Sequence, residues 1–306
     1  MERTEAFGAL VRGGCRLCPR ECGADREAGS TGFCGVTAQP TAARAALHYW
    51  EEPCISGKEG SGAVFFSGCT LRCVFCQNYE IAAGRAGRPV SGERLAEIFL
   101  ELQEKGANNL NLVTATQFLP SVVPALLRAR KRGLSIPVVY NSGGYEKTET
   151  LRLLEGIVDV WLPDLKYRSS ELAARYSRAA DYPEVAAEAI REMARQAGEP
   201  VFDGRGLMQR GVVVRHLVLP GCVRDSKDVL EHLWDTYGDR IYVSVMSQYT
   251  PRPHAAAYPE LARRVTEEEY EEVVDYARFL GMKNVYIQEG ECAKESFIPA
   301  FDCEGV

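Results

Sequence analysis

The stretch that decides the fold of this 306-residue chain reads AVFFSGCTLRCVFCQN, residues 63–78. Its first five residues are rich in β-formers and predict a strand that ends at Gly68. In the loop that follows, Cys69, Cys73 and Cys76 have the spacing C-x3-C-x2-C. A structural zinc site normally takes four ligands, and no fourth Cys or His lies nearby in this loop. Three thiolates on a four-iron cluster would leave one iron open, which indicates a site for chemistry. A structural metal knuckle or buried free thiols are the alternatives.

Beyond this loop, short apolar runs alternate with segments of helical spacing. Residues 94–105, for example, carry Leu95, Ile98 and Leu102 on one helix face. Strands are predicted at residues 63–67, 110–114, 136–141, 158–163, 212–219 and 241–246, and a short closing strand at 285–287. Helices are predicted at residues 94–105, 119–132, 147–155, 170–178, 183–196, 226–237 and 266–279.

Repeated strand–helix units predict an α/β fold with a parallel sheet covered by helices. Six clear units are fewer than the eight of a closed barrel, which favours an open, partial (β/α)6-type barrel. A doubly wound open sheet is the alternative. In both architectures the loops at the carboxyl ends of the strands form the active site.

The first sixty residues are predicted to form a small Cys-rich extension. Cys15, Cys18, Cys22 and Cys34 lie in a Gly-rich stretch with the spacing C-x2-C-x3-C-x11-C. Four soft ligands with little core of their own predict a metal-stabilised segment, and both zinc and a second 4Fe-4S cluster accept four thiolates. The predicted organisation is therefore a metal-binding extension over residues 1–60, a partial barrel over 61–290 and a C-terminal tail over 291–306.

The three-cysteine loop resembles the signature of radical S-adenosylmethionine (SAM) enzymes, C-x3-C-x-aromatic-C, with Phe75 as the aromatic residue. The resemblance implies a 4Fe-4S cluster on Cys69, Cys73 and Cys76, with the amino and carboxylate groups of SAM on the fourth iron. It also implies that an electron from the cluster cleaves SAM to methionine and a 5′-deoxyadenosyl radical, which abstracts a hydrogen atom from a substrate. An electron donor of flavodoxin or ferredoxin type is the implied partner.

A narrower resemblance is to the group of enzymes similar to pyruvate formate-lyase activating enzyme, as an uncharacterised subgroup. It extends over most of residues 10–303. The segments that carry it are FFSGC at residues 65–69, QNYEI at 77–81, EP at 52–53, ISG at 55–57, GSG at 60–62 and RHLVLPG at 215–221. This resemblance suggests hydrogen abstraction from a glycine of a partner enzyme. A peptide or a small molecule is an equally open substrate.

The resemblance also places SAM-binding residues at the strand ends. Thr114 and Thr116 stand where the family usually has a Gly-Gly-Glu type turn, and this chain departs from that motif. Asn141, Ser142 and Gly143 resemble the family's Ser-Asn-Gly turn, with a plain strand-to-helix loop as the alternative. Asp164 and Lys166 resemble an Asp-x-Lys motif in which the lysine pairs with the SAM carboxylate, with a surface ion pair as the alternative.

Arg215 lies inside an apolar strand, where an unpaired charge would be costly. It must therefore face a polar lumen or meet a carboxylate, and it is a candidate contact to SAM or substrate. His216 is predicted to be a satisfied strand residue, and His254 to lie in a loop near the barrel mouth. Residues that follow strands give further candidates. Cys222 is a catalytic candidate, which could donate a hydrogen atom or merely pack, and the substrate-side candidates are Gln248, Tyr249, Gln288 and Glu289.

Composition narrows the class of protein. The formal net charge of −6 gives no indication of non-specific binding to nucleic acid or to phospholipid membranes. Eleven cysteines, an odd number, argue against a paired disulfide framework, and neither a signal peptide nor a transmembrane stretch is evident. A cytoplasmic protein with reduced thiols is expected. Zincin, α/β-hydrolase and P-loop motifs are absent from the sequence. The alternative to a radical SAM enzyme is a non-catalytic iron–sulfur or zinc protein that senses redox state or binds a partner.

Overall fold

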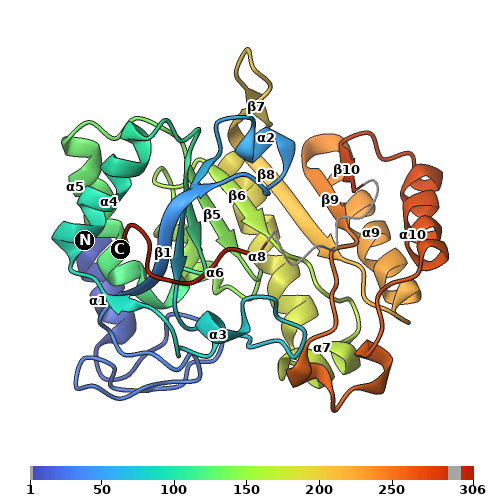
Figure 1. Ribbon diagram of the computed structural model, residues 1–306, viewed down its shortest axis with the longest axis horizontal. Helices are drawn as coiled ribbons and strands as arrows, with labels where there is room; N and C mark the ends of the chain where they lie inside the picture. The colour runs from blue at the N-terminus through green and yellow to red at the C-terminus, as the bar shows by residue number, and fades with distance from the viewer. Residues whose placement is uncertain (1–2, 289–297) are drawn as a thin grey trace.

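The computed structural model describes residues 3–288 and 298–306, and its centre is a mostly parallel sheet (Figure 1). Seven parallel strands follow one another in the order β10-β9-β8-β6-β5-β4-β2. Each strand predicted from the sequence is present, and β8 begins earlier than predicted. The bounds are β2 (Ser61–Phe66), β4 (Leu110–Val113), β5 (Val138–Ser142), β6 (Val160–Pro163), β8 (Met208–Leu217), β9 (Tyr242–Met246) and β10 (Val285–Ile287).

The sheet is not closed. Beyond β2 the path continues antiparallel through β1 (Thr41–His48) to β3 (Arg88–Pro89), so that its two ends are β10 and β3. A two-residue strand, β7 (Val201–Phe202), pairs antiparallel with the start of β8. The predicted open, partial α/β barrel is thereby confirmed.

Helices cover the outer face of the sheet, with α4 and α5 at one side of Figure 1 and α9 and α10 at the other. Outward-facing strand residues such as Leu112, Tyr140 and Trp161 belong to the same buried cluster as Leu95, Val122 and Ile190 of the helices. The seven predicted helices are α4 (Gly92–Glu104), α5 (Leu119–Lys131), α6 (Thr148–Arg152), α7 (Ser170–Ser177), α8 (Tyr182–Ala197), α9 (Val223–Tyr237) and α10 (Glu267–Leu280). Three further helices are α1 (Arg3–Val11), α2 (Pro53–Ser56) and α3 (Tyr79–Ala82).

Strand alternation divides the sheet into an outer face and a lumen. Val139, Val160 and Val213 face inward and form a separate apolar cluster with Cys54 and Ile55 of α2. This cluster closes the amino-terminal end of the lumen, and we call it the floor. The short helix that carries Cys54 begins with Pro53 at its first position, where a missing N–H costs nothing. Cys54, to which the sequence assigns no role, is therefore a packing residue of the floor.

The N-terminal segment is continuous with the sheet. The predicted boundary at residue 60 falls between β1 and β2, whose residues pair from Ala42 with Phe66 to His48 with Ser61. Residues 12–40 contain no helix or strand. The end of the chain runs beside β1, where the Cys303 amide donates to the Ala43 carbonyl at 2.9 Å. Sequence periodicity does not reveal β1, because four of the eight residues in TAARAALH are alanine and only the first, Thr41, is β-branched.

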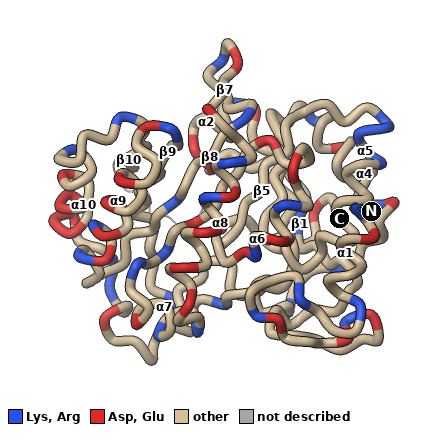
Figure 2. The backbone as a smooth tube through the Cα atoms, turned by 180° about the vertical axis from the view of Figure 1, so that it is seen from behind, with Lys and Arg blue, Asp and Glu red and all other residues tan. Residues whose placement is uncertain are grey.

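The described part of the chain includes no helix that is long and apolar enough to cross a membrane. Basic and acidic residues are interspersed along the chain, and both signs also occur around β8 in the middle of the molecule (Figure 2).

The turn after β5 lies directly against the end of β6, and this contact requires glycine. Gly144 has φ +77°, and a Cβ built on it would lie 2.1 Å from the Asp164 carbonyl oxygen. We predict that Gly144→Ala lowers the free energy of unfolding by about 3 kcal/mol or more, from left-handed strain and the clash together. Gly106→Ala, at φ +85° with no atom within 4 Å, should cost only about 1–2 kcal/mol. Denaturant unfolding measures both, and equal losses would show that the clash is absent.

Candidate functional site

The three-cysteine loop follows β2 at the carboxyl end of the sheet and is held from two sides. Gln117 is buried after β4, and its side-chain amide donates to the carbonyls of Ser67, Gly68 and Thr114 at 2.7–3.1 Å. From the N-terminal segment, the Cys34 carbonyl accepts a hydrogen bond from the Cys69 amide at 3.3 Å. The loop is thus fixed to the neighbouring strand and to the Cys-rich segment.

The aromatic residue of the loop anchors it in a cluster of rings. The Phe75 side chain is buried, and its ring meets those of Tyr167 and Tyr176 edge-to-face at centroid distances of 6.2 and 6.4 Å. The Lys166 side chain also lies over the Phe75 ring, with its Nζ 5.9 Å from the ring centre. The loop is therefore positioned next to the cation that follows β6.

The thiols of the loop lie in a protein environment that can donate hydrogen bonds to sulfur. The Ser177 hydroxyl donates to Cys73 Sγ at 3.0 Å, and the Leu71 amide donates to Cys69 Sγ at 3.4 Å. Burial raises the pKa of Cys73 and of Cys76, whereas nearby Lys166 acts in the opposite direction on both. Buried thiols of this kind ionise only when a bound positive charge compensates the thiolate.

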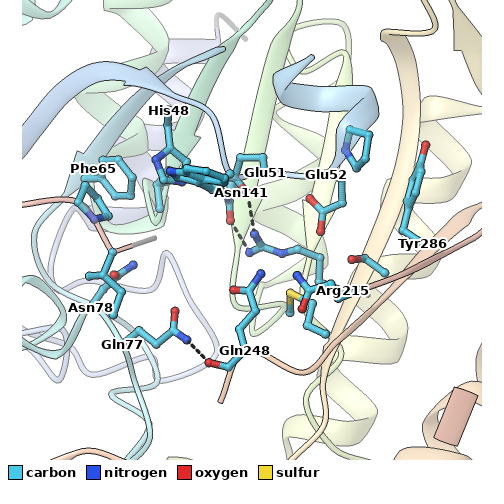
Figure 3. A pocket seen from close by; sticks show the side chains of 18 of the residues that line it. His48, Glu51, Glu52, Phe65, Gln77, Asn78, Asn141, Arg215, Gln248 and Tyr286 are labelled. Carbon is cyan, nitrogen blue, oxygen red and sulfur yellow. Dashed lines mark hydrogen bonds and ion pairs between the residues drawn. The ribbon is translucent and has the colours of Figure 1, made fainter. Parts of the chain in front are cut away.

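A cavity of about 370 Å³ occupies the lumen between the floor and the three-cysteine loop (Figure 3). Gln77 and Asn78, the two residues after Cys76, line one side of it, and Ser244 and Tyr286 from the last two strands line the other. The remaining lining residues are His48, Trp50, Glu51, Glu52, Pro53, Phe65, Val113, Asn141, Arg215, Met246, Gln248, Ile287, Gln288, Ile298 and Pro299.

Arg215 organises the polar part of this lumen. Its guanidinium donates to Glu51 at 3.1 Å, to Asp164 at 2.9 Å and to the Asn141 side-chain oxygen at 2.7 Å. Asp164 and Arg215 are register neighbours on adjacent strand ends, which brings the pair together. The expectation that a charge in this strand meets a carboxylate is confirmed. Together the two carboxylates and the Asn141 oxygen accept a hydrogen bond from each of the three guanidinium nitrogens.

Lys166 and Asp164 form an ion pair at 2.5 Å in which both side chains are largely buried, so this pair is not a surface contact. Asp164 is therefore shared between Lys166 and Arg215, and these two cations hold its pKa low against the opposing effect of burial. Gly143 packs closely against this group, since a Cβ on it would lie 3.1 Å from Leu71 and 3.7 Å from Lys166. The predicted residues Asn141, Gly143, Asp164, Lys166 and Arg215 thus gather at one place beside the loop.

Glu51 and Glu52 were not singled out as site residues from the sequence. They enter the lumen from the segment between β1 and β2, so no strand-end pattern marks them. Burial raises the pKa of both carboxyl groups, and Arg215 opposes this shift in each. The signal that could have found them is a pair of adjacent carboxylates beside a proline in an otherwise apolar, Gly-rich stretch.

Two of the predicted SAM-binding side chains face elsewhere. Thr116 is buried behind the sheet, where its hydroxyl donates to Glu146 at 2.7 Å and lies 3.0 Å from the Tyr140 hydroxyl. Ser142 faces the same outer side, and its Oγ accepts a hydrogen bond from the Gly144 amide at 3.3 Å. Neither side chain faces the lumen, because alternation along β5 directs Ser142 outward and Thr116 lies in the single helical turn, Thr116–Phe118, that follows β4. A contact of these residues to SAM stays a prediction for their backbone groups. Thr114 has φ +57°, a strained conformation for a β-branched residue, at the turn where the family usually has glycine.

Of the candidate residues that follow the later strands, some line the cavity and others do not. Gln248 and Gln288 line the cavity, and the Gln248 carbonyl accepts a hydrogen bond from Gln77 at 2.9 Å. Tyr249 is fully buried and donates to the Leu261 carbonyl at 2.5 Å, so the structure corrects it to a packing residue. Cys222 is not among the cavity-lining residues, and burial raises its pKa to about 11. Glu289 lies outside the described residues.

The two histidines behave as expected from their positions. His216 is buried, and its two ring nitrogens lie 2.8 Å from the Leu165 carbonyl and 2.9 Å from the Ser226 hydroxyl. His254 stacks on Tyr79, three residues beyond Cys76, with ring centroids 4.0 Å apart.

Comparison with known families decides the assignment of the three-cysteine loop. Residues 63–221, just over half of the chain, match the radical SAM superfamily. The chain belongs to the radical SAM superfamily. The resemblance of the loop is confirmed, and members of this superfamily are enzymes that use a 4Fe-4S cluster and SAM.

The chain is also similar to individual proteins. It is 28% identical to an uncharacterised protein of Methanocaldococcus jannaschii, MJ0674, over 89% of this chain and 76% of that protein. The fold is similar to that of SuiB from Streptococcus suis, solved with its precursor peptide SuiA, with a TM-score of 0.50 and 14% identity. That alignment covers 73% of this chain and 47% of SuiB, so the radical SAM chain spans about half of SuiB. A domain of pyruvate-formate lyase-activating enzyme from Bacteroides vulgatus is also similar, with 15% identity, a TM-score of 0.40, and coverage of 55% and 89% of the two chains.

The donor set of this radical SAM protein fits the family's cluster. Cys69, Cys73 and Cys76 are free thiols on one anchored loop, beside a buried cation and at the edge of the cavity. Within residues 3–288 and 298–306, no group of three or more His, Cys, Asp or Glu side chains is arranged to hold a metal ion. The fit therefore rests on the donor chemistry and the family. The N-terminal cysteines are also free, with Cys15 and Cys34 buried and Cys22 exposed.

The stability of the protein should depend on pH through the buried carboxyl group of Glu146, which accepts a hydrogen bond from the Thr116 hydroxyl. Burial raises the pKa of Glu146 from 4.5 to about 7, so the folded chain binds this proton more tightly than the unfolded chain. We predict that the free energy of unfolding falls by about 3 kcal/mol between pH 4.5 and pH 8 through this group. Glu146→Gln should remove that part of the decrease, and Glu104→Gln, at an exposed position, should not. Denaturant unfolding at pH 5 and pH 8 tests this, and an unchanged difference in Glu146→Gln would contradict it.

Proposed function

We propose that this protein binds a 4Fe-4S cluster on Cys69, Cys73 and Cys76 and binds SAM in the adjoining lumen, where it acts as a hydrogen-abstracting enzyme. The observation that carries the proposal is the continuity between loop and cavity, because Gln77 and Asn78 follow Cys76 directly and line the cavity. A loop with three thiols therefore stands at the mouth of a lumen whose other end is closed by the floor. When bound, cluster and SAM supply one electron and a 5′-deoxyadenosyl radical that takes a hydrogen atom from the substrate.

The residues around the cavity have separate tasks in this proposal. Lys166 supplies the positive charge for the SAM carboxylate, while Asp164 positions the ammonium group through their ion pair. Gly143, which has no Cβ, lets the turn after β5 pack closely against Leu71 and Lys166. Asn141 and Arg215 stabilise the wall of the lumen through the hydrogen bond between their side chains. The apolar floor excludes water from the enclosed end, which protects a reactive radical from side reactions.

The proposed substrate classes are those left open by the sequence. They are a glycine of a partner enzyme, another peptide, or a small molecule, with an electron donor of flavodoxin or ferredoxin type. A cytoplasmic location and the activating-enzyme subtype belong to the same proposal. The enclosed lumen supports an enzyme over a redox sensor, since a sensor has no need of a cavity beside its open cluster.

The direct test is SAM cleavage. After anaerobic reconstitution with iron and sulfide, we predict that dithionite and SAM yield 5′-deoxyadenosine, measured by liquid chromatography, with or without added substrate. The Cys69/Cys73/Cys76→Ala triple variant should form none, because three thiolates are needed to hold the cluster. A wild-type protein that carries a full cluster and forms no 5′-deoxyadenosine would instead favour a non-catalytic iron–sulfur protein.

Lys166 tests the SAM site separately. We predict that Lys166→Ala weakens SAM binding by about 10- to 100-fold, because a charge-assisted hydrogen bond contributes about 1.5–3 kcal/mol. The visible spectrum of the cluster should be unchanged. Lys227→Ala, which removes a lysine paired with Glu272 on the outer helices, is the matched control and should bind SAM normally. Unchanged SAM affinity in Lys166→Ala would remove Lys166 from the site.

The N-terminal cysteines are proposed to hold a second metal. We predict that the Cys69/Cys73/Cys76→Ala protein still retains metal, and that further replacement of Cys15 and Cys18 by Ala releases it. Metal and sulfide analysis distinguishes the two candidates: about four iron atoms per chain indicate a cluster, and about one zinc atom indicates a structural site. A triple variant that retains neither metal would contradict the proposal.

A further inference from the structure

The cavity contains one carboxyl group, that of Glu52, that forms no ion pair with another described residue, whereas Arg215 pairs with Glu51 and Asp164. Among the described residues that line it, the side chains that can carry full charges are Glu51, Glu52 and Arg215, apart from His48. Burial lowers the pKa of His48 to about 4, which keeps its ring neutral. The cavity therefore has two carboxylates and one guanidinium. Asp164, just outside it, has its own counter-ion in Lys166.

Arg215 donates to Glu51 and not to Glu52, whose carboxyl group is hydrogen-bonded, within the described residues, only to neutral groups, its own backbone amide and the Ser244 side chain. Glu51 receives hydrogen bonds from Arg215 at 3.1 Å, from Asn111 at 3.0 Å and from Asn141 at 3.1 Å. The Glu52 side chain is also buried, with 7% of the residue exposed, but its Oε2 atom has no hydrogen-bond partner among the described residues. The two adjacent carboxyl groups therefore differ. Glu51 accepts hydrogen bonds from three side chains, whereas one oxygen of Glu52 has no partner among the described residues.

The backbone fixes the position of Glu52 while its side chain stays available. The Glu52 carbonyl accepts hydrogen bonds from the amides of Ile55 and Ser56 at 2.8 and 3.0 Å, which begin α2. Its side chain points into the lumen beside Arg215 (Figure 3). The neighbouring lining residues are Ser244 of β9 and Tyr286 of β10. This is the side of the cavity across from Gln77 and Asn78, which adjoin the cysteine loop.

We infer that the Glu52 side of the lumen is a subsite for a positively charged group of the substrate, an ammonium or a guanidinium. This inference rests on the proposed function and specifies the substrate of the same site. A buried carboxylate without a counter-ion is costly, and a bound cation removes that cost by an ion pair and hydrogen bonds. The aromatic rings of Trp50 and Tyr286 line the same cavity and are suited to contact with a cation. With a neutral or anionic substrate Glu52 could be neutralised only by a proton, in the direction in which burial raises its pKa.

SAM also carries positive charge, so the test must separate the two ligands. The probes are pentylammonium, pentylguanidinium and pentan-1-ol, which share one alkyl chain and differ in charge. Their dissociation constants are measured at about pH 8 on the reconstituted protein, saturated with SAM and without dithionite, so that turnover is not needed. The variants are Glu52→Gln, which removes the charge, and Glu52→Asp, which keeps it. Glu146→Gln makes the same change at a buried carboxylate that does not line the cavity.

We expect the wild-type protein and Glu146→Gln to bind at least one of the two cations ten times or more tightly than the alcohol. Glu52→Gln should lose this preference at least tenfold, and Glu52→Asp should retain part of it. Thermal unfolding and SAM affinity establish that each variant is folded. The inference is overturned if Glu52→Gln keeps the preference, or if the SAM-saturated wild-type protein binds neither cation more tightly than the alcohol. Formation of 5′-deoxyadenosine, measured on the same samples, shows independently whether the proposed function holds.

Discussion

The structure of the lumen depends on one buried guanidinium. Arg215 lies in an inner strand, and its hydrogen bonds connect three separate elements: Glu51 from the segment before β2, Asn141 at the end of β5 and Asp164 after β6. Desolvating an arginine is expensive, and only such a complete set of acceptors makes its burial acceptable. Removal of Arg215 would leave Glu51 buried without a cation and Asp164 with Lys166 alone, so the lumen is organised around Arg215.

From this interaction the two ends of the lumen acquire different properties. Below Arg215 the inward side chains are apolar and pack against α2, which closes the barrel. Toward the carboxyl ends, Asp164 connects Arg215 to Lys166, and Lys166 lies over Phe75 in the three-cysteine loop. A continuous set of contacts therefore runs from the segment that carries Glu51 to the loop that is proposed to hold the cluster. In this arrangement Lys166, the cation proposed to bind SAM, and Arg215 in the wall of the cavity share a single carboxylate, Asp164.

Much of the fold and of the candidate site could be predicted from the sequence, because the relevant signals are local. Apolar runs of the right length located all seven parallel strands, the cysteine spacing identified the loop, and Arg215 in an apolar strand indicated a polar lumen. The errors have one physical origin, which is that the direction of a side chain beyond a strand end is not encoded locally. Thr116 and Tyr249 follow strands but turn into the packed layers. Glu51 and Glu52 reach the lumen through an antiparallel strand, β1, whose alanine-rich sequence shows no strand pattern.

The two cysteine-containing segments, which are distinct in sequence, are adjacent in space. Arg20, between Cys18 and Cys22, donates to the Thr70 carbonyl in the three-cysteine loop at 2.9 Å. Any metal on the N-terminal cysteines would thus be bound beside the radical SAM loop, and its loss would also disturb that loop.

The central claim is that the three-cysteine loop holds a cluster with one iron left for SAM. Electron–nuclear double resonance on the reduced, reconstituted protein tests it most directly, with SAM isotopically labelled in its amino and carboxylate groups. The account predicts hyperfine coupling of both labelled groups to the cluster. A strong cluster signal with no coupling to either label would contradict it.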